Sequence, residues 1–198
     1  MLILKKVAVT GGLSCGKSSV CRIFKDLGAY VVSADDIVHQ LLTPETIPGK
    51  KVIELIGSDI VVDHQLDRSK IAQKVFGNLH LLKSLEQILH PAVRDEIEKY
   101  YQQAVREGKA TLFVAEIPLL FEAFSSCYPI TIAVTADKEA CIRRFTQSSG
   151  YNREEYEKRM ARQLTPEEKA QRATYVIPND GTMADLRQAV IEVYNKLI

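Results

Sequence analysis

The feature that most constrains this chain is the run Gly-Gly-Leu-Ser-Cys-Gly-Lys-Ser at residues 11–18. An apolar segment, Val7–Thr10, precedes the run, and apolar residues at helical spacing follow it from Val20 to Leu27. A strand, a G-x-x-x-x-G-K-S loop and a helix form, in this order, the setting that binds nucleotide phosphates. The sequence therefore predicts an α/β protein that binds a nucleoside triphosphate at this loop.

Each part of the loop has a chemical role. Glycines let the backbone curl so that successive N–H groups converge on phosphate oxygens, and the helix dipole adds positive potential at the same point. Lys17 can reach the outer phosphates, and the Ser18 hydroxyl can ligate Mg²⁺. The predicted nucleotide site comprises Gly12, Leu13, Ser14, Cys15, Gly16, Lys17, Ser18 and Ser19, with Ser18 as the metal ligand.

The composition limits the remaining possibilities. A chain of 198 residues with 46% hydrophobic residues suits one globular domain with a sizeable core. The formal net charge of +1 predicts no general affinity for nucleic acid or for a membrane, and no apolar run is long enough to span one. The number of subunits is left open. Four cysteines without a C-x-x-C pair indicate reduced thiols in a cytoplasmic protein: Cys15, Cys21, Cys127 and Cys141.

Apolar segments alternate with helical patterns along the chain. After the first strand, further strands are expected at residues 30–33, 111–118, 130–134 and 175–177. Because these segments are largely apolar, they are typical of parallel strands that are buried on both faces. The alternation predicts a three-layer α/β fold, with a parallel sheet of about five strands covered by helices on both faces.

A helical insert interrupts this alternation. Residues 43–69 give weak signals, and a long helical pattern then runs from about Arg68 to Arg106. Pro91 is expected to break or kink the helix. We expect an acceptor-binding insert over about 43–107, within a single domain whose core comprises residues 1–42, 108–147 and 172–198.

A polar, arginine-rich segment covers about residues 148–171. Gly150 and Pro166 punctuate it, and it includes Arg153 and Arg159. We expect a mobile lid that brings arginines onto phosphates. The alternative is a solvated charged face, which is what most such runs form.

Two acidic positions follow predicted strands. Asp35 and Asp36 come at the carboxyl end of the second strand, the edge where open α/β sheets bind ligands. One of them is placed to act as a base beside the loop; alternatively, Ser33 and both aspartates cap a helix that begins at Ile37.

Glu116, near the end of the third strand, is suited to hold a Mg²⁺-bound water, or else lies at the exposed rim of the sheet.

Taken together, the motifs resemble those of the dephospho-coenzyme A kinase family along nearly the whole chain. The phosphate loop alone is shared by many families, whereas L-H-P, P-L-L-x-E and N-x-G in this order are more specific. The matching segments are Thr10–Ser18, Ser33–Asp35 for D-A-D, Leu89–Pro91, Pro118–Glu122, Arg144, Arg159–Gln163 for R-[IM]-x-x-Q, and Asn179–Gly181.

The resemblance implies an ATP- and Mg²⁺-dependent kinase that phosphorylates the ribose 3′-hydroxyl of dephospho-coenzyme A, giving coenzyme A and ADP. It implies that Asp35 is the base and that Lys17 and Arg144 balance charge on the transferred group. Further nucleotide contacts are implied for Arg159, Asn179 and Gly181. Acceptor contacts are implied for Asp35, His90, Pro91, Leu120, Glu122 and Gln163. From the residues alone, His90 reads as a helix-kink residue that is hydrogen-bonded locally.

The chain departs from the family pattern at Ser14, Cys15, Ser33 and Ser148. Ser14 stands where the family usually has glycine, so its backbone angles must stay permitted for a residue with a Cβ. Ser33 replaces the first aspartate of D-A-D, which leaves Asp35 as the stronger candidate for the base. Arg143 or Arg153 could supply the phosphate contact that Ser148 lacks.

Two other functions compete with this reading. A kinase of another small alcohol, such as a nucleoside or a sugar acid, would share the sheet and the loop, but the insert with His90 and the Pro118–Glu122 segment argue against it. A GTPase switch would call for an N-K-x-D segment after a strand, and Thr135–Lys138 lacks the asparagine.

Overall fold

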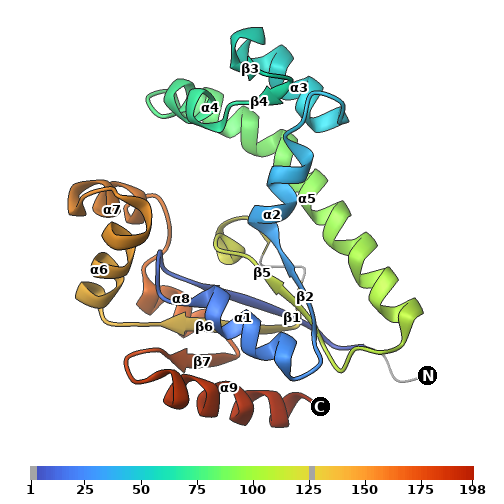
Figure 1. Ribbon diagram of the computed structural model, residues 1–198, viewed down its shortest axis with the longest axis vertical. Coiled ribbons are helices and arrows are strands. Elements are labelled where there is room, and N and C mark those ends of the chain that lie inside the picture. Colours follow the sequence, from blue (N-terminus) through green and yellow to red (C-terminus); the bar gives the residue numbers. More distant parts are fainter. Residues whose placement is uncertain (1–3, 125–127) are drawn as a thin grey trace. The chain divides into compact units, whose positions relative to one another are not determined.

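The computed structural model describes residues 4–124 and 128–198. Internal contacts divide the chain into two units (Figure 1). The first unit comprises Met1–Ser33 and Tyr101–Ile198, and the second comprises Ala34–Tyr100. Each unit is described by itself.

A five-stranded parallel sheet forms the centre of the first unit (Figure 1). All four strand pairs are parallel, and β1 lies in the middle, so the predicted doubly covered α/β sheet is confirmed. In spatial order the strands are β2 (Tyr30–Ser33), β5 (Phe113–Glu116), β1 (Lys6–Gly11), β6 (Ile130–Thr135) and β7 (Tyr175–Pro178).

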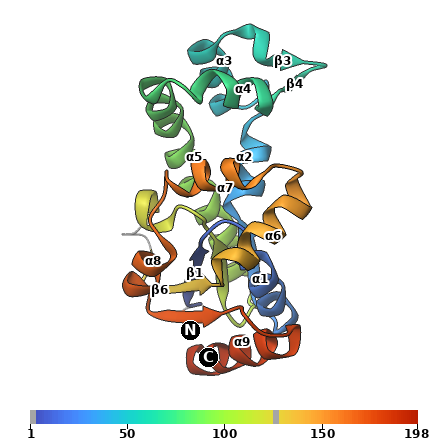
Figure 2. The ribbon, with the colours of Figure 1, turned by 90° about the vertical axis from the view of Figure 1, so that its left-hand side faces the viewer.

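Helices cover both faces of this sheet. Alternate residues of a strand point to opposite faces, and Val7, Ala8, Val9 and Thr10 are all fully buried, so β1 is covered on both sides. The helix α1 (Lys17–Asp26) packs against α9 (Met183–Leu197), which runs alongside β7 (Figures 1 and 2). This unit also contains α6 (Lys138–Ser149), α7 (Arg153–Met160) and α8 (Pro166–Arg172).

The second unit contains more structure than the sequence pattern predicts. The helix α3 (Ile47–Ile56) has Pro48 and Gly49 in its first turn, where neither residue breaks a helix, and the Thr46 side chain accepts a hydrogen bond from the Gly49 amide. A short hairpin turns through Asp63 and His64, both with positive φ in place of the usual glycine. The unit also contains α2 (Ala34–Leu41), η1 (Ser58–Ile60), β3 (Val61–Val62), β4 (Gln65–Leu66), α4 (Arg68–Val75) and most of α5 (Leu79–Glu107).

Pro91 is expected to break or kink the helix, and the break is wrong. The helix α5 runs for 29 residues through Pro91, and the interruption falls at residues 76–78 instead. Asn78 accepts a hydrogen bond from the Leu81 amide at 3.0 Å and so begins α5. The helix tolerates the single backbone bond that proline removes because buried side chains hold it on both sides of this point, among them Leu89 and Val93.

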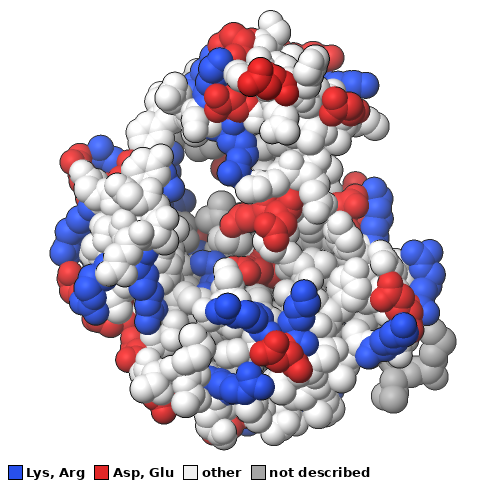
Figure 3. Space-filling model, in the orientation of Figure 1, with Lys and Arg blue, Asp and Glu red and all other residues white. Residues whose placement is uncertain are grey.

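Charge is spread over the surface. On the face shown in Figure 3, Lys and Arg alternate with Asp and Glu, in keeping with the net charge of +1. Among the described residues, no helix is both long enough and apolar enough to cross a membrane. The three described cysteines, Cys15, Cys21 and Cys141, are free thiols, and Cys127 lies outside the described residues.

Candidate active site

The phosphate loop connects β1 to α1, and Gly16 is its tightest point. Gly16 has φ +101°, and a Cβ there would lie 2.1 Å from Asn179 Nδ2, so only glycine fits. Ser14 also has a positive φ, +56°, a region that residues with a Cβ seldom adopt. The loop is therefore held in a conformation that most residues avoid.

The Asn179–Gly181 turn supports the loop from the end of β7. The Asn179 side chain donates to the Cys15 carbonyl at 2.8 Å, and the Asn179 amide donates to the Thr135 carbonyl at 2.8 Å. A Cβ at Gly181 would lie 2.6 Å from Asp185 Oδ2. Asn179, predicted as a nucleotide contact, therefore supports the loop in this structure.

Arg144 lies on α6 beside the same turn. One terminal nitrogen, Nη2, donates to the Asn179 carbonyl at 3.1 Å. The other, Nη1, is buried and has no hydrogen-bond partner among residues 4–124 and 128–198. Buried cationic donors without an acceptor are costly, so this nitrogen is prepared to receive an anionic oxygen.

Lys17 and Leu13 are occupied by contacts inside the protein. The Lys17 ammonium donates to the Gly12 carbonyl at 2.8 Å and to the Gly11 carbonyl at 3.3 Å. The Leu13 amide donates to the thioether sulfur of Met160 at 3.5 Å, a weak acceptor. The groups that the sequence assigns to phosphate are thus gathered at one point, with weak or local partners that a phosphate can replace.

Ser18 and Glu116 meet at the carboxyl edge of the sheet. The Ser18 hydroxyl donates to Glu116 Oε1 at 2.8 Å, and Glu116 is the last residue of β5. Burial raises the pKa of the neighbouring Cys21 thiol well above its usual range, and the Glu116 carboxylate adds to this effect. The described residues contain no cluster of three or more His, Cys, Asp or Glu side chains that could hold a metal. A hydroxyl and a carboxylate are oxygen donors of the kind that Mg²⁺ takes alongside phosphate and water.

Two arginines of the predicted lid form ion pairs on the protein surface. Arg159 pairs with Glu155 at 2.8 Å and stacks over the Tyr151 ring at 4.7 Å from its centroid. Arg153 makes a two-pronged contact with Glu139 at 2.7 and 3.0 Å. These exposed pairs contribute little stability, so the guanidinium groups can exchange them for phosphate at small cost.

A cavity of about 360 Å³ lies between the phosphate loop, α7 and the ends of α6 and α8. Gly12, Cys15, Cys141 and Tyr156 are among the residues that line it. Burial raises the pKa of both thiols, so they stay protonated near neutral pH. Cys15 therefore contributes its backbone to the loop and no reactive thiolate.

The Pro118–Glu122 segment is joined to the base of the lid. It leads into the single π-helical turn η2 (Leu120–Phe124), in which Leu120 is fully buried, so any acceptor contact there involves the backbone. Glu122 Oε1 accepts from the Leu164 amide at 2.9 Å. Glu122 and Gln163 are brought together by Lys169, which the sequence analysis missed because the seven residues of α8 are too few to show a buried stripe.

Three predicted site residues lie in the second unit. The helix α2 begins at Ala34, three residues before the start that the capping alternative assumed, so Asp35 lies within its first turn. The alternative that Asp35 and Asp36 cap a helix beginning at Ile37 is therefore wrong. Asp35 is exposed and follows Ser33, the register partner of Glu116, by two residues. His90 and Pro91 lie in the middle of α5, and burial lowers the pKa of His90.

A parallel sheet whose central strand feeds a G-x-x-x-x-G-K-S loop into a helix, with a serine hydroxyl and a carboxylate at the carboxyl edge, defines a phosphate-loop nucleotide-binding protein. The family model for dephospho-CoA kinase matches residues 5–185, and the chain belongs to this family.

Relatives and solved structures agree with this assignment. A dephospho-CoA kinase of Protochlamydia amoebophila is 50% identical over 199 residues, covering 100% of this chain and 98% of the relative. A Thermus thermophilus crystal structure matches with TM-score 0.84 and 31% identity over 100% of both chains. Dephospho-CoA kinase from Campylobacter jejuni matches with TM-score 0.70 and 30% identity over 96% of each chain. A shikimate kinase of Acinetobacter baumannii, 17% identical with TM-score 0.54 over 98% of this chain and 94% of its own, shares the fold.

Proposed function

We propose that the protein transfers the γ-phosphoryl group of ATP to the ribose 3′-hydroxyl of dephospho-CoA, giving CoA and ADP in the last step of CoA synthesis. The observation that carries this proposal is the match of residues 5–185 to the dephospho-CoA kinase family. The loop geometry supports it, because phosphoryl transfer requires alignment and charge neutralisation more than covalent chemistry.

The phosphate loop and Arg144 bind the triphosphate. On binding, Lys17 exchanges the Gly12 carbonyl for phosphate oxygens, and the Leu13 amide exchanges the Met160 sulfur for a stronger, charged acceptor. The buried Nη1 of Arg144 gains the anionic partner that it lacks. Arg159 completes the charge balance when it leaves Glu155.

Mg²⁺ fits the pair formed by Ser18 and Glu116. The Ser18 hydroxyl would be a direct ligand of the ion, and Glu116, 2.8 Å from that hydroxyl, would hold a coordinated water or ligate the ion itself. The bound ion would neutralise charge on the β- and γ-phosphates.

The helical insert, about residues 43–107, binds the acceptor. Asp35 accepts the proton of the 3′-hydroxyl as it attacks. Within the insert, His90 and Pro91 contact the acceptor. Free thiols at the three described cysteines fit a cytoplasmic location, where thiols stay reduced.

The lid, about residues 148–171, closes over bound nucleotide and excludes water. We place the motion in α7 and its flanking turns, because α8 packs against β6 and β1. Gly150, with φ +73° and open space around it, is suited to the hinge.

The experiment that tests this function compares acceptors. Purified protein is incubated with Mg-ATP and either dephospho-CoA, adenosine or shikimate, and ADP release is followed. We expect turnover with dephospho-CoA only. Turnover with adenosine or shikimate, and none with dephospho-CoA, would assign the chain to another small alcohol.

A further inference from the structure

Lys169 is the one charged side chain among the described residues that is fully buried. It lies on α8, the helix that packs against β6 and β1. An isolated ammonium buried in a protein interior is strongly destabilising, so its partners must satisfy it. The contacts of Lys169 therefore show what this cation does.

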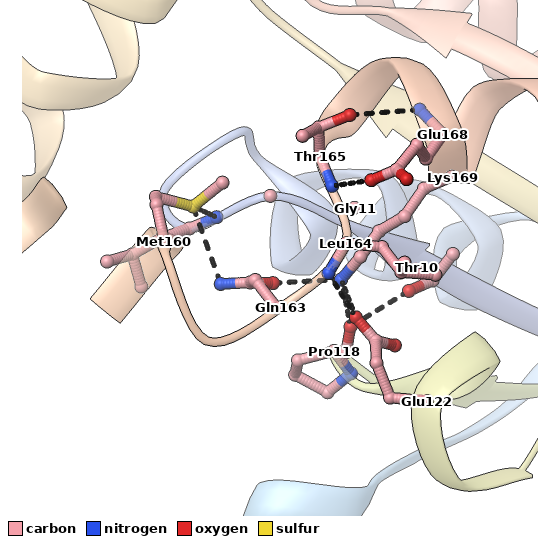
Figure 4. A network of polar contacts seen from close by, with 12 residues as sticks. Thr10, Gly11, Pro118, Glu122, Met160, Gln163, Leu164, Thr165, Glu168 and Lys169 are labelled. Atoms are coloured by element: carbon pink, nitrogen blue, oxygen red, sulfur yellow. Dashed lines mark hydrogen bonds and ion pairs between the residues drawn. The ribbon is translucent and has the colours of Figure 1, made fainter. Parts of the chain in front are cut away.

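The ammonium of Lys169 has three partners, which match its three N–H donors (Figure 4). It donates to the Pro118 carbonyl at 2.7 Å and to Gln163 Oε1 at 2.8 Å. It also pairs with Glu122 Oε1 at 3.2 Å. One cation thus joins the segment after β5 to the segment that precedes α8.

These contacts fix which way the Gln163 amide faces. An ammonium can only donate, so Lys169 selects the oxygen of Gln163 and turns the NH₂ group away. That NH₂ group donates to the Met160 sulfur at 3.4 Å, and the same sulfur accepts from the Leu13 amide of the phosphate loop at 3.5 Å. Figure 4 shows this chain of contacts running from Lys169 through Gln163 to Met160.

We propose that Lys169 is a positioning residue for phosphoryl transfer, which orients Gln163 so that its NH₂ group donates to the outer phosphate when nucleotide displaces Met160. The proposal deepens the proposed function and rests on it for the identity of the acceptor. Without Lys169 the Gln163 amide is free to turn over, and an oxygen would then face the phosphate.

Stability alone gives a poor account of Lys169. A buried ion pair is often no more stabilising than apolar side chains of similar volume. What the ammonium adds is a fixed orientation for three acceptors on two segments. Burial lowers the pKa of the Lys169 ammonium. The nearby Lys17 lowers this pKa further, whereas Glu122 raises it.

The test uses Lys169→Met, Lys169→Arg and Gln163→Glu. The control is Lys158→Met, because Lys158 pairs with Glu154 at 2.9 Å on the exposed surface of the lid. Gln163→Glu keeps an oxygen for Lys169, replaces the NH₂ donor by a second acceptor oxygen and adds a negative charge. Lys169→Arg keeps the charge and the donors if Lys169→Met fails to fold.

We expect Lys169→Met and Gln163→Glu to lower kcat about 10- to 100-fold, the usual effect of a misplaced group, and to raise KM for ATP, because the lost hydrogen bond is to the outer phosphate. Lys169→Arg should recover part of kcat, and Lys158→Met should match the wild type. Wild-type kcat should fall at alkaline pH, at a lower pH than that at which an ordinary lysine loses its proton. This fall should be absent in Lys169→Arg because arginine stays protonated. Wild-type kcat from Gln163→Glu, or from a folded Lys169→Met, would overturn the proposal.

A binding measurement separates this proposal from the proposed function. The affinities of each variant for ADP and for a non-hydrolysable ATP analogue require no acceptor. Lys169→Met and Gln163→Glu should lose affinity for the analogue and keep affinity for ADP. An equal loss of affinity for both nucleotides would overturn the positioning role. If instead the variants show the selective loss but the wild type does not phosphorylate dephospho-CoA, only the assignment of dephospho-CoA is overturned.

Discussion

Replacing Gly16 by alanine should disrupt the contacts that support the phosphate loop. The resulting loss of folding free energy can be estimated from the structure. The backbone at Gly16 has φ +101°, and a Cβ there costs about 1 kcal/mol or more in this region. The new methyl group would lie 2.1 Å from Asn179 Nδ2, so the bond from Asn179 to the Cys15 carbonyl must break. Leaving these buried groups unpaired costs a further 1–3 kcal/mol, roughly, and the sum is about 2–4 kcal/mol.

The matched control is Gly108→Ala. Gly108 also has positive φ, +62°, but a Cβ there meets nothing within 4 Å. Gly108→Ala should therefore lose only the free energy that a Cβ costs at positive φ, about 1 kcal/mol. Urea unfolding of the wild type and both variants measures the two free energies, provided that the slopes against urea stay equal.

A second measurement on the same proteins concerns the nucleotide. A non-hydrolysable ATP analogue at about one hundred times its Kd should stabilise the wild type and Gly108→Ala by about 2.7 kcal/mol. Gly16→Ala should lose most of this gain. The reasoning fails if Gly16→Ala costs no more than Gly108→Ala, or if it keeps the full stabilisation by the analogue.

Four further predictions concern single groups. Lys17→Ala should abolish turnover and leave the urea midpoint unchanged, and near-wild-type kcat would show that the loop is not the phosphate site. Asp35→Asn should lower kcat about 10²-fold or more, with Asp36→Asn mild by comparison, because Asp35 is the proposed base; the kcat values and melting temperatures of both variants check this, and the reverse order would refute it. Amide hydrogen exchange at residues 150–163 should slow when an ATP analogue binds, and equal exchange in both states would count against a lid. Burial lowers the pKa of His90, so the unfolded state binds more protons between that pKa and 6.5, and stability should fall as pH decreases through this window; His90→Gln should remove the fall in urea midpoint, and an unchanged fall would assign it to other groups.

The sheet and the phosphate loop could be predicted because local signals determine them. The strands β1, β5 and β6 are largely apolar, and few structures other than a doubly covered parallel sheet bury such segments. The loop could be predicted because glycine stands where the backbone conformation leaves no room for a side chain, as at Gly16.

The details that the sequence did not reveal depend on tertiary packing. Pro91 removes one backbone hydrogen bond, and the buried neighbours that outweigh this loss come from packing. Asp63 and His64 adopt positive φ without the glycine that usually marks such a turn. Lys169 looks like a surface lysine in sequence, and its burial becomes visible only when Pro118, Glu122 and Gln163 are brought together in space.

The position of the candidate base illustrates a boundary error with a chemical consequence. The sequence allowed Asp35 to cap a helix starting at Ile37, but α2 starts at Ala34 and places Asp35 within the first turn. There it interacts with the helix dipole, which is worth about 0.3–1 kcal/mol. A large loss of activity in Asp35→Asn with a small change in stability would thus separate chemistry from helix stabilisation.

The central claim is the transfer of phosphate from ATP to the 3′-hydroxyl of dephospho-CoA, and the product of that reaction tests it most directly. Wild-type protein, Mg-ATP and dephospho-CoA are incubated, and the product is analysed by mass spectrometry and phosphorus NMR. We predict that the product gains one phosphoryl group, and that its new phosphorus signal couples to the ribose 3′ proton. A product phosphorylated elsewhere, or ADP release with unchanged dephospho-CoA, would contradict the claim.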